Sequence, residues 1–282
     1  MHLSKAQIKW VRSLQLKKNR DAEGVFVAEG EKCVNELRNA FELVLLATPE
    51  NATSTEIEQM SSLRTPQGVI GVFKRRGERF EARGERRSAP QKSADFSGTP
   101  QAKGERLSAP QKSADFPGTP QARGERLVVA LDGVQDPGNL GTIIRTCDWF
   151  GINDILCSHD TADCYNPKVV QATMGALARV RLHYVDLPQV LAEIKAEGTP
   201  LYGTLLEGIN MYQPHAIADK QQGVIIMGNE GKGISPAVRQ LITHPLLIPS
   251  YPADAETSES LNVGIATAIV LAEFRRRGAP SV

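Results

Sequence analysis

The chain has 282 residues, 41% of them hydrophobic, and a formal net charge of +1. These values indicate one or two globular domains, and they exclude binding to a polyanion through overall charge alone. The first ten residues, MHLSKAQIKW, lack the apolar stretch of a signal peptide, and no apolar run reaches the roughly 20 residues that span a bilayer. We therefore expect a cytoplasmic protein with no membrane partner.

The four cysteines, Cys33, Cys147, Cys157 and Cys164, form no CxxC pair and no Cys/His pattern with zinc spacing. The histidines fall in no HxE or HExxH pattern. We expect reduced, mostly buried thiols, no disulfide framework and no metal.

Basic residues are concentrated at the beginning of the chain. The first twenty residues contain no acidic side chain but six basic ones, which are Lys5, Lys9, Arg12, Lys17, Lys18 and Arg20. The large part after residue 126 is acidic, so a polyanion would have to be bound locally. An RNA-binding face and a solvated helix face both remain open on this feature.

Residues 1–74 predict a small α/β domain, because helix-like and strand-like patterns alternate. The expected helices are 3–18, 31–39 and 54–62, and the expected strands are 25–30, 42–48 and 68–73.

The segment 75–126 repeats itself with a period of 20: SAPQKSADFSGTPQAKGERL at 88–107 is followed by SAPQKSADFPGTPQARGERL at 108–127. It contains one branched aliphatic residue, Leu107, against five prolines and six glycines. Such a segment cannot bury enough apolar area to offset the entropy of ordering. We expect a disordered linker.

Residues 127–282 predict a second α/β domain. Apolar strands are expected at 127–134, 154–158, 179–185, 200–206, 224–228 and 246–250, with helices at 139–150, 166–177, 187–197, from 236 and at 260–277. This alternation favours a mostly parallel sheet covered on both faces. Ligands of such sheets bind outside the carboxyl ends of the strands.

Three loops follow strands at that edge: DGVQDPGNLGTIIRT (132–146), MGNEGKGISP (227–236) and IPSYPADAETSESLNVGIATA (248–268). The second has the wrong glycine spacing for a phosphate-binding loop or a dinucleotide fingerprint. Ser235 loosely resembles a nucleophile, but Pro236 favours Ser235 as a helix N-cap. The last helix is apolar nearly all round and is expected in the core or in a subunit interface.

Polar residues recur in these loops in a specific order. Asn139 and Arg145 are in the first, Glu230 follows Asn229 in the second, and Ser260 and Asn262 are in the third. Each alone is a common cap or turn residue, so the pattern depends on their co-occurrence.

In this order, DPGNLGTIIRT, GNEGKGIS and IPSYP with SESLNVGIATAIVLAEF resemble the three motifs of the SpoU branch of the SPOUT superfamily, the S-adenosylmethionine-dependent RNA 2'-O-ribose methyltransferases. The resemblance covers 127–277. FVAEGEK (26–32) is similar to part of the ribosomal-protein-like substrate-binding domain that many such enzymes carry. The resemblance implies a C-terminal α/β trefoil knot and a homodimer.

The resemblance also implies site residues by motif position. The cofactor-binding residues are Thr204, Leu205, Gly228, Ile248 and Leu261. The catalytic set is Asn139, Arg145, Glu230, Ser260 and Asn262. Because arginine is almost never neutral, we interpret Arg145 as gripping the phosphate and stabilising the alkoxide, and leave the identity of the base open.

The third motif departs from the family in its expanded stretch SYPADAETSE, which leaves the roles of Ser258 and Ser260 open. We expect a ribose methyltransferase acting on ribosomal RNA. For such an enzyme the basic residues at the start of the chain become the predicted RNA-binding residues: Lys5, Lys9, Arg12, Lys17, Lys18 and Arg20. The alternatives are a transfer RNA 2'-O-methyltransferase, a base methyltransferase and a non-catalytic RNA-binding protein of the same fold.

Overall fold

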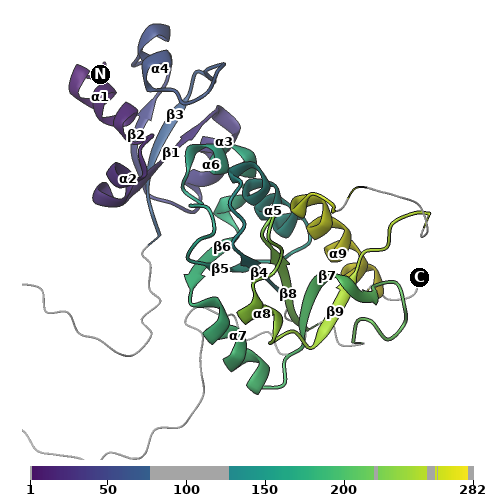
Figure 1. Cartoon of the computed structure of the whole chain (residues 1–282). Helices are drawn as coiled ribbons and strands as arrows, with labels where there is room; N and C mark the ends of the chain where they lie inside the picture. Colours follow the sequence, from purple (N-terminus) through teal and green to yellow (C-terminus); the bar gives the residue numbers. More distant parts are fainter. Residues whose placement is uncertain (1, 77–126, 219–221, 253–257, 259, 279–282) are drawn as a thin grey trace, which may run out of the picture. The chain divides into compact units, whose positions relative to one another are not determined.

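The computed structural model of the protein describes residues 2–76, 127–218, 222–252, 258 and 260–278, which form two sheets with their helices (Figure 1). The repeat-containing segment predicted as a disordered linker lies outside the described residues, apart from Arg75 and Arg76. No helix in the described part of the chain is both long and apolar enough to cross a membrane.

The N-terminal sheet is antiparallel, with strand order β1-β3-β2. Its elements are α1 (Lys5–Ser13), α2 (Lys17–Glu23), β1 (Val25–Glu29), α3 (Glu31–Arg38), β2 (Leu43–Ala47), α4 (Ser54–Met60) and β3 (Ile70–Lys74). The three strands were predicted correctly. The single helix expected over 3–18 was wrong, because the chain turns after Leu14 and begins a second helix at Lys17.

Strand β1 is buried on both faces, and its alternate residues enter two different cores. Val25 and Val27 pack with residues of α1 and α4, whereas Phe26 and Ala28 join the core of the second sheet. The ring of Phe26 lies 4.8 Å from that of Tyr165, between centroids. The N-terminal sheet therefore shares a hydrophobic core with the rest of the described chain.

The larger sheet has six strands in the order β6-β5-β4-β8-β7-β9, and all five pairings are parallel. Helices cover both faces, with α5, α6 and α9 on one and α7 and α8 on the other (Figure 1). The parallel α/β architecture predicted from the alternating segments is confirmed. The elements in chain order are β4 (Leu127–Asp132), α5 (Pro137–Trp149), β5 (Asp154–Ser158), α6 (Pro167–Thr173), a 3₁₀ turn η1 (Ala176–Ala178), β6 (Arg181–Val185), α7 (Leu187–Ala196), β7 (Leu201–Asn210), β8 (Gly223–Gly228), α8 (Pro236–Arg239), β9 (His244–Leu247) and α9 (Val263–Gly278).

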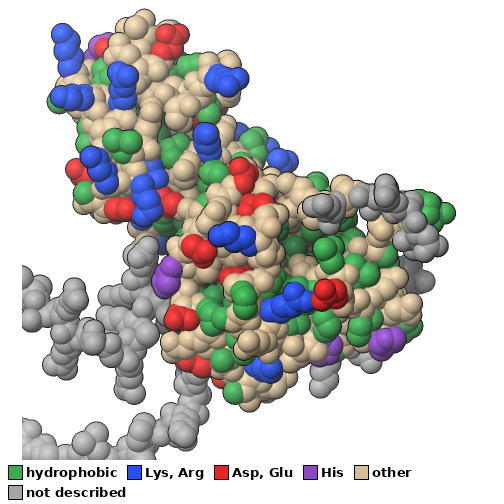
Figure 2. Space-filling model, in the orientation of Figure 1, with side chains coloured by type: hydrophobic (Ala, Val, Ile, Leu, Met, Phe, Trp, Pro, Cys, Tyr) green, Lys and Arg blue, Asp and Glu red, His purple; other side chains and the backbone are tan. Residues whose placement is uncertain are grey.

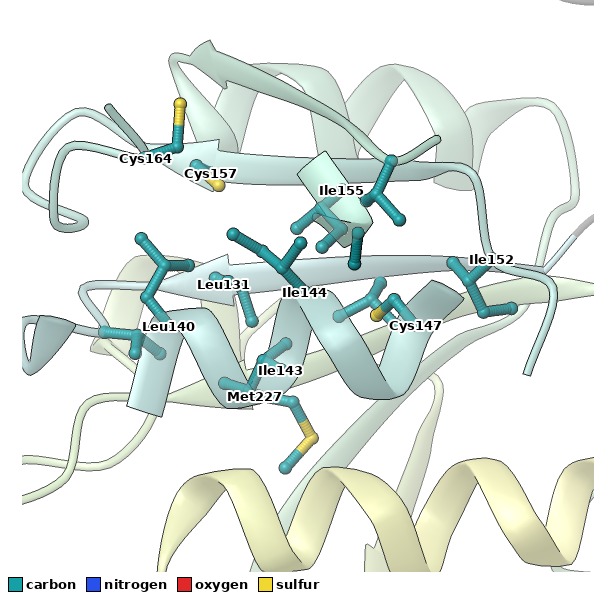
Figure 3. Close-up of a cluster of buried hydrophobic side chains, with 14 of the residues drawn as sticks. Leu131, Leu140, Ile143, Ile144, Cys147, Ile152, Ile155, Cys157, Cys164 and Met227 are labelled. Carbon is teal, nitrogen blue, oxygen red and sulfur yellow. The ribbon is translucent and has the colours of Figure 1, made fainter. Parts of the chain in front are cut away.

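The core between α5 and the sheet is apolar and close-packed (Figure 3). It includes Cys147, Cys157 and Cys164, and all four cysteines of the chain are buried free thiols, as predicted. Burial raises the pKa of Cys164 to about 12, so this thiol stays protonated at neutral pH.

The N-terminal basic run is not uniformly exposed. Arg20 is 1% exposed; it donates a 2.7 Å hydrogen bond to Asp163 and two more to the carbonyls of Leu14 and Gln15. The prediction that Arg20 binds RNA is therefore wrong, because its guanidinium is buried in an ion pair that joins α2 to the loop before α6.

Candidate functional site

Three of the five predicted catalytic residues meet where β4 and β8 end. Asn139 Nδ2 donates to Glu230 Oε1 at 3.1 Å, and Asn262 Nδ2 donates to Asn139 Oδ1 at 2.8 Å. The pairing register of β4 and β8 places the ends of the two strands side by side, with Asp132 opposite Gly228. The chain thus joins one residue from each of the three loops into a single hydrogen-bonded network.

Helix caps orient both asparagines. Asp136 is the N-cap of α5 and accepts from Asn139 N at 2.8 Å. Asn262 immediately precedes α9, and its Oδ1 accepts from Gly264 N at 2.9 Å and Ile265 N at 3.2 Å. The amide of Asn262 therefore has a fixed orientation, with only its NH₂ group directed to Asn139.

Glu230 is held at the N-terminus of α5. Its carboxylate accepts from Gln135 N at 3.3 Å, Asp136 N at 3.1 Å and Asn139 Nδ2. Partial burial alone would raise the pKa of Glu230, but hydrogen bonds from Asn139 and from backbone N–H groups outweigh burial and lower it. The helix dipole also favours a negative charge here. Glu230 is thus an ionised anchor and a poor proton acceptor at neutral pH.

The loop that carries Glu230 closes on itself. Asn229 and Gly233 exchange two backbone hydrogen bonds of 3.0 Å, and Asn229 Oδ1 accepts from Gly231 N and Lys232 N, also at 3.0 Å. A Cβ at position 228 would collide with the backbone of Gly233. Glycine at 228 is therefore required by the fold of this loop, before any ligand is considered.

Two side chains tie this loop to the end of β4. Asn229 Nδ2 donates to Gly133 O at 2.6 Å, and Asp132 Oδ2 accepts from Ser235 N at 2.7 Å. Ser235 occupies the predicted N-cap position of α8, but its side chain makes no capping hydrogen bond. Sequence reasoning gave no role to Asn229 or Asp132; their positions at the ends of adjacent strands were the available signal.

Arg145 and Ser260 lie outside the network. Arg145 is exposed on α5, six residues after Asn139 and so about 240° around the helix from it. Among the residues that the structure describes, no side-chain hydrogen bond or ion pair involves Arg145 or Ser260. Arg145 is therefore available to a ligand and does not pair with Glu230.

The five predicted cofactor residues follow neighbouring strands. Thr204 is the last residue of β7 before the pairing with β9 is interrupted, and Leu205 follows it. Gly228 ends β8 and Ile248 follows β9, while Leu261 precedes Asn262. Because β8, β7 and β9 are adjacent and parallel, the first four residues lie along one edge of the sheet. Leu261 is 49% exposed, so an apolar surface remains open there.

The other predicted RNA-binding residues are exposed on the N-terminal helices. Lys5, Lys9 and Arg12 follow the i, i+4, i+7 spacing of one face of α1, and Lys17 and Lys18 begin α2. Figure 2 shows basic side chains gathered over these N-terminal elements. Within the described chain, no group of three His, Cys, Asp or Glu side chains is arranged to hold a metal ion.

The SpoU rRNA Methylase family model matches residues 126–272, more than half of the chain. The chain belongs to this family. Residues 5–56 match the MRM3-like substrate binding domain. The family match covers all three loops of the network, and the second match covers the basic face of α1 and α2.

Curated SpoU relatives match over the same half of the chain. A 23S rRNA (guanosine(2553)-2'-O)-methyltransferase, RlmP, of Bacillus subtilis is 37% identical over 148 residues, which are 52% of this chain and 57% of that protein. A 23S rRNA (guanosine-2'-O-)-methyltransferase, RlmB, of Neisseria meningitidis is 32% identical over 151 residues, 53% of this chain and 58% of that protein. The chain thus spans a little over half the length of these relatives.

Solved structures are similar over nearly the whole chain. A protein of Porphyromonas gingivalis assigned to the TrmH family of RNA methyltransferases aligns with a TM-score of 0.73 and 34% identity, covering 98% of this chain and 100% of that one. An AdoMet-bound rRNA methyltransferase of Sinorhizobium meliloti aligns with a TM-score of 0.74 and 26% identity, and the alignment covers 99% of this chain and 98% of that one. The N-terminal and C-terminal elements therefore occur together in these relatives.

Proposed function

We propose that this SpoU-family protein is an RNA 2'-O-ribose methyltransferase that uses S-adenosylmethionine. The observation that carries the proposal is the network of Asn139, Glu230 and Asn262, because it joins the three family motifs in one hydrogen-bonded site. Arg145 of the first motif is exposed on the helix that carries Asn139. The names of the relatives that match this region support ribose as the acceptor.

The residues at the edge of β7, β8 and β9 fit an adenosyl cofactor. Leu206 and Ile209 in the second half of β7 are 74% and 42% exposed, and Leu261 is 49% exposed before α9. Apolar surfaces beside backbone polar groups are typical of small-molecule sites. We assign Thr204, Leu205, Gly228, Ile248 and Leu261 to this binding site. S-adenosylmethionine supplies an electrophilic methyl group when it is bound.

In this proposal, Arg145 binds the RNA phosphate beside the target ribose and stabilises negative charge on the attacking oxygen. Asn139 and Asn262 hold the first and third motif loops in register, which aligns the hydroxyl with the methyl group. Glu230 fixes the N-terminus of α5. Since the pKa of Glu230 is lowered and its oxygens already accept hydrogen bonds, we do not assign it as the base. Ser260 is assigned to the site by its motif position.

Ribosomal RNA is the substrate that we favour. The family model and several relatives are named for rRNA, and the match to a substrate-binding domain at 5–56 suggests a folded target. We assign Lys5, Lys9, Arg12, Lys17 and Lys18 to the RNA-binding face. Exposed basic side chains attract RNA phosphates through their positive charge, without reading the base sequence. A cytoplasmic location belongs to the same proposal.

A trefoil knot and a homodimer complete the proposal. Beyond Thr204 the second half of β7 pairs with β9 again, and a Cβ on Gly208 would collide with the backbone of Leu246. This close approach of two segments supports the proposed knot. Trp149 on α5 and Ile265 on α9 are 85% and 52% exposed on two helices that pack together. A second copy could cover both side chains.

The proposal is tested by incubating the protein with isotope-labelled S-adenosylmethionine and unmodified ribosomal and transfer RNA, then digesting the RNA to nucleosides for mass spectrometry. We expect label on a ribose of ribosomal RNA. Arg145→Ala should abolish transfer and leave cofactor affinity near that of the wild type. Label on a base, or on transfer RNA alone, would contradict the assigned acceptor or substrate.

A further inference from the structure

Asp148 lies three residues after Arg145 on α5, at a spacing where an arginine and a carboxylate on one helix can pair. Such a pair would occupy the guanidinium that the proposed function gives to the RNA phosphate. Among the described residues Arg145 nevertheless has no partner, although Asp148 is only partly buried. A residue outside α5 satisfies Asp148 instead.

Arg179 binds Asp148 through a bidentate contact. Its Nε donates to Asp148 Oδ1 and its Nη2 donates to Asp148 Oδ2, each at 2.8 Å. Both carboxylate oxygens are thus engaged by a planar fork, which is the preferred geometry for an arginine and a carboxylate. The geometry points to Arg179 as a positioning residue that occupies Asp148 and so keeps Arg145 free for RNA; this inference rests on the proposed function.

Arg179 is itself held in place by the N-terminal elements. Its Nη1 donates to Glu36 Oε2 on α3 at 2.6 Å. Gly175 permits this approach, because a Cβ at that position would lie 2.7 Å from the Cβ of Glu36. Hydrogen bonds to Asp148 and then to Glu36 raise the pKa of Arg179 above its ordinary value. Helix α3, one of the N-terminal elements, therefore helps to hold Arg179 against Asp148, so that the negative charge of Asp148 is compensated next to Arg145.

Loss of Arg179 should act on RNA in two ways. A freed Asp148 can compete for Arg145, and its uncompensated negative charge repels an approaching phosphate. Exposed ion pairs are individually weak, so the expected change is modest: Arg179→Gln should weaken RNA binding about threefold to tenfold. Cofactor affinity should not change, because Asp148 and Arg179 are on the far side of α5 from the network of Asn139 and Glu230.

The decisive test is rescue of Arg179→Gln by Asp148→Asn. The double variant has lost the same hydrogen bonds but no longer presents a competing carboxylate, so its RNA affinity should return to within about twofold of the wild type. Asp148→Asn alone should be near wild type. Glu36→Gln is the matched control, since it removes the negative charge from the other contact of Arg179 and leaves Asp148 occupied; it should weaken RNA binding less than Arg179→Gln.

The measurements are the Kd for ribosomal RNA by filter binding, the KM for RNA and kcat in the transfer assay, and the Kd for S-adenosylhomocysteine by calorimetry. A loss in Arg179→Gln that persists in the double variant would show a merely structural role and overturn the inference, as would unchanged RNA binding in Arg145→Ala. Because RNA affinity is measured directly, a wild-type protein that binds RNA but transfers no methyl group would contradict the proposed function only.

Discussion

Asn229→Asp removes one hydrogen bond from the closed loop, and the new side chain has the same size and shape as the native one. The new carboxylate still accepts from Gly231 N and Lys232 N, but it cannot donate to Gly133 O, which the native amide reaches at 2.6 Å. The lost bond and the repulsion between two acceptors in a half-buried position should destabilise the closed loop by about 2 kcal/mol. That free energy corresponds to a factor of about 30 in the loop equilibrium.

The affinity for S-adenosylmethionine reports this change, because a cofactor that binds only the closed loop loses affinity in proportion to the closed fraction. Calorimetry should show an increase in Kd of up to about thirtyfold for Asn229→Asp. Lys232→Ala, in the same loop but with an exposed side chain, is the control and should bind as the wild type does. Wild-type affinity in Asn229→Asp would refute the reasoning that this bond holds the loop.

Three further predictions concern Gly228, Arg20 and Glu230. Gly228→Ala should open the loop and weaken cofactor binding in calorimetry, whereas Gly231→Ala, whose Cβ meets only Asn229 Oδ1 at 3.8 Å, should not. Arg20→Ala should lower the free energy of unfolding in urea by about 3 kcal/mol, because it leaves Asp163 without its buried partner; Lys17→Ala should leave unfolding unchanged and weaken RNA binding. Since its pKa is lowered in the folded protein, Glu230 stabilises the fold above its ordinary pKa of 4.5, and this contribution is lost as the pH falls through the folded value. Thermal unfolding should therefore show wild type losing more stability than Glu230→Gln between about pH 7 and pH 3.

Much of the fold could be predicted from the sequence because burial on both faces leaves a clear signal. The runs around Val129, Ile155 and Ile225 are short, apolar and separated by helical patterns, which indicates a parallel sheet. The same pattern located the three loops, since the residues after such strands share one edge. The union of Asn139, Glu230 and Asn262 followed from that topology and from the family motifs.

What could not be predicted depends on contacts between distant segments. Arg20 looked exposed because its neighbours are basic, yet its partner Asp163 is 143 residues away. The turn after Leu14 has no glycine or proline to mark it. Gly228 was predicted to bind the cofactor from its motif position alone, and nothing in the sequence indicated that a Cβ there would also collide with the backbone of Gly233. The roles of the individual site residues stay predictions.

Transfer of a methyl group to a ribose 2'-hydroxyl can be tested most directly by alkaline hydrolysis of RNA labelled by the protein. Alkali cleaves RNA through attack of the free 2'-hydroxyl on the adjacent phosphate, and a methyl group on that oxygen blocks the cleavage. We expect the label in alkali-resistant dinucleotides, and we expect no label with Arg145→Ala. Label recovered in mononucleotides would place the methyl group on a base and contradict the account.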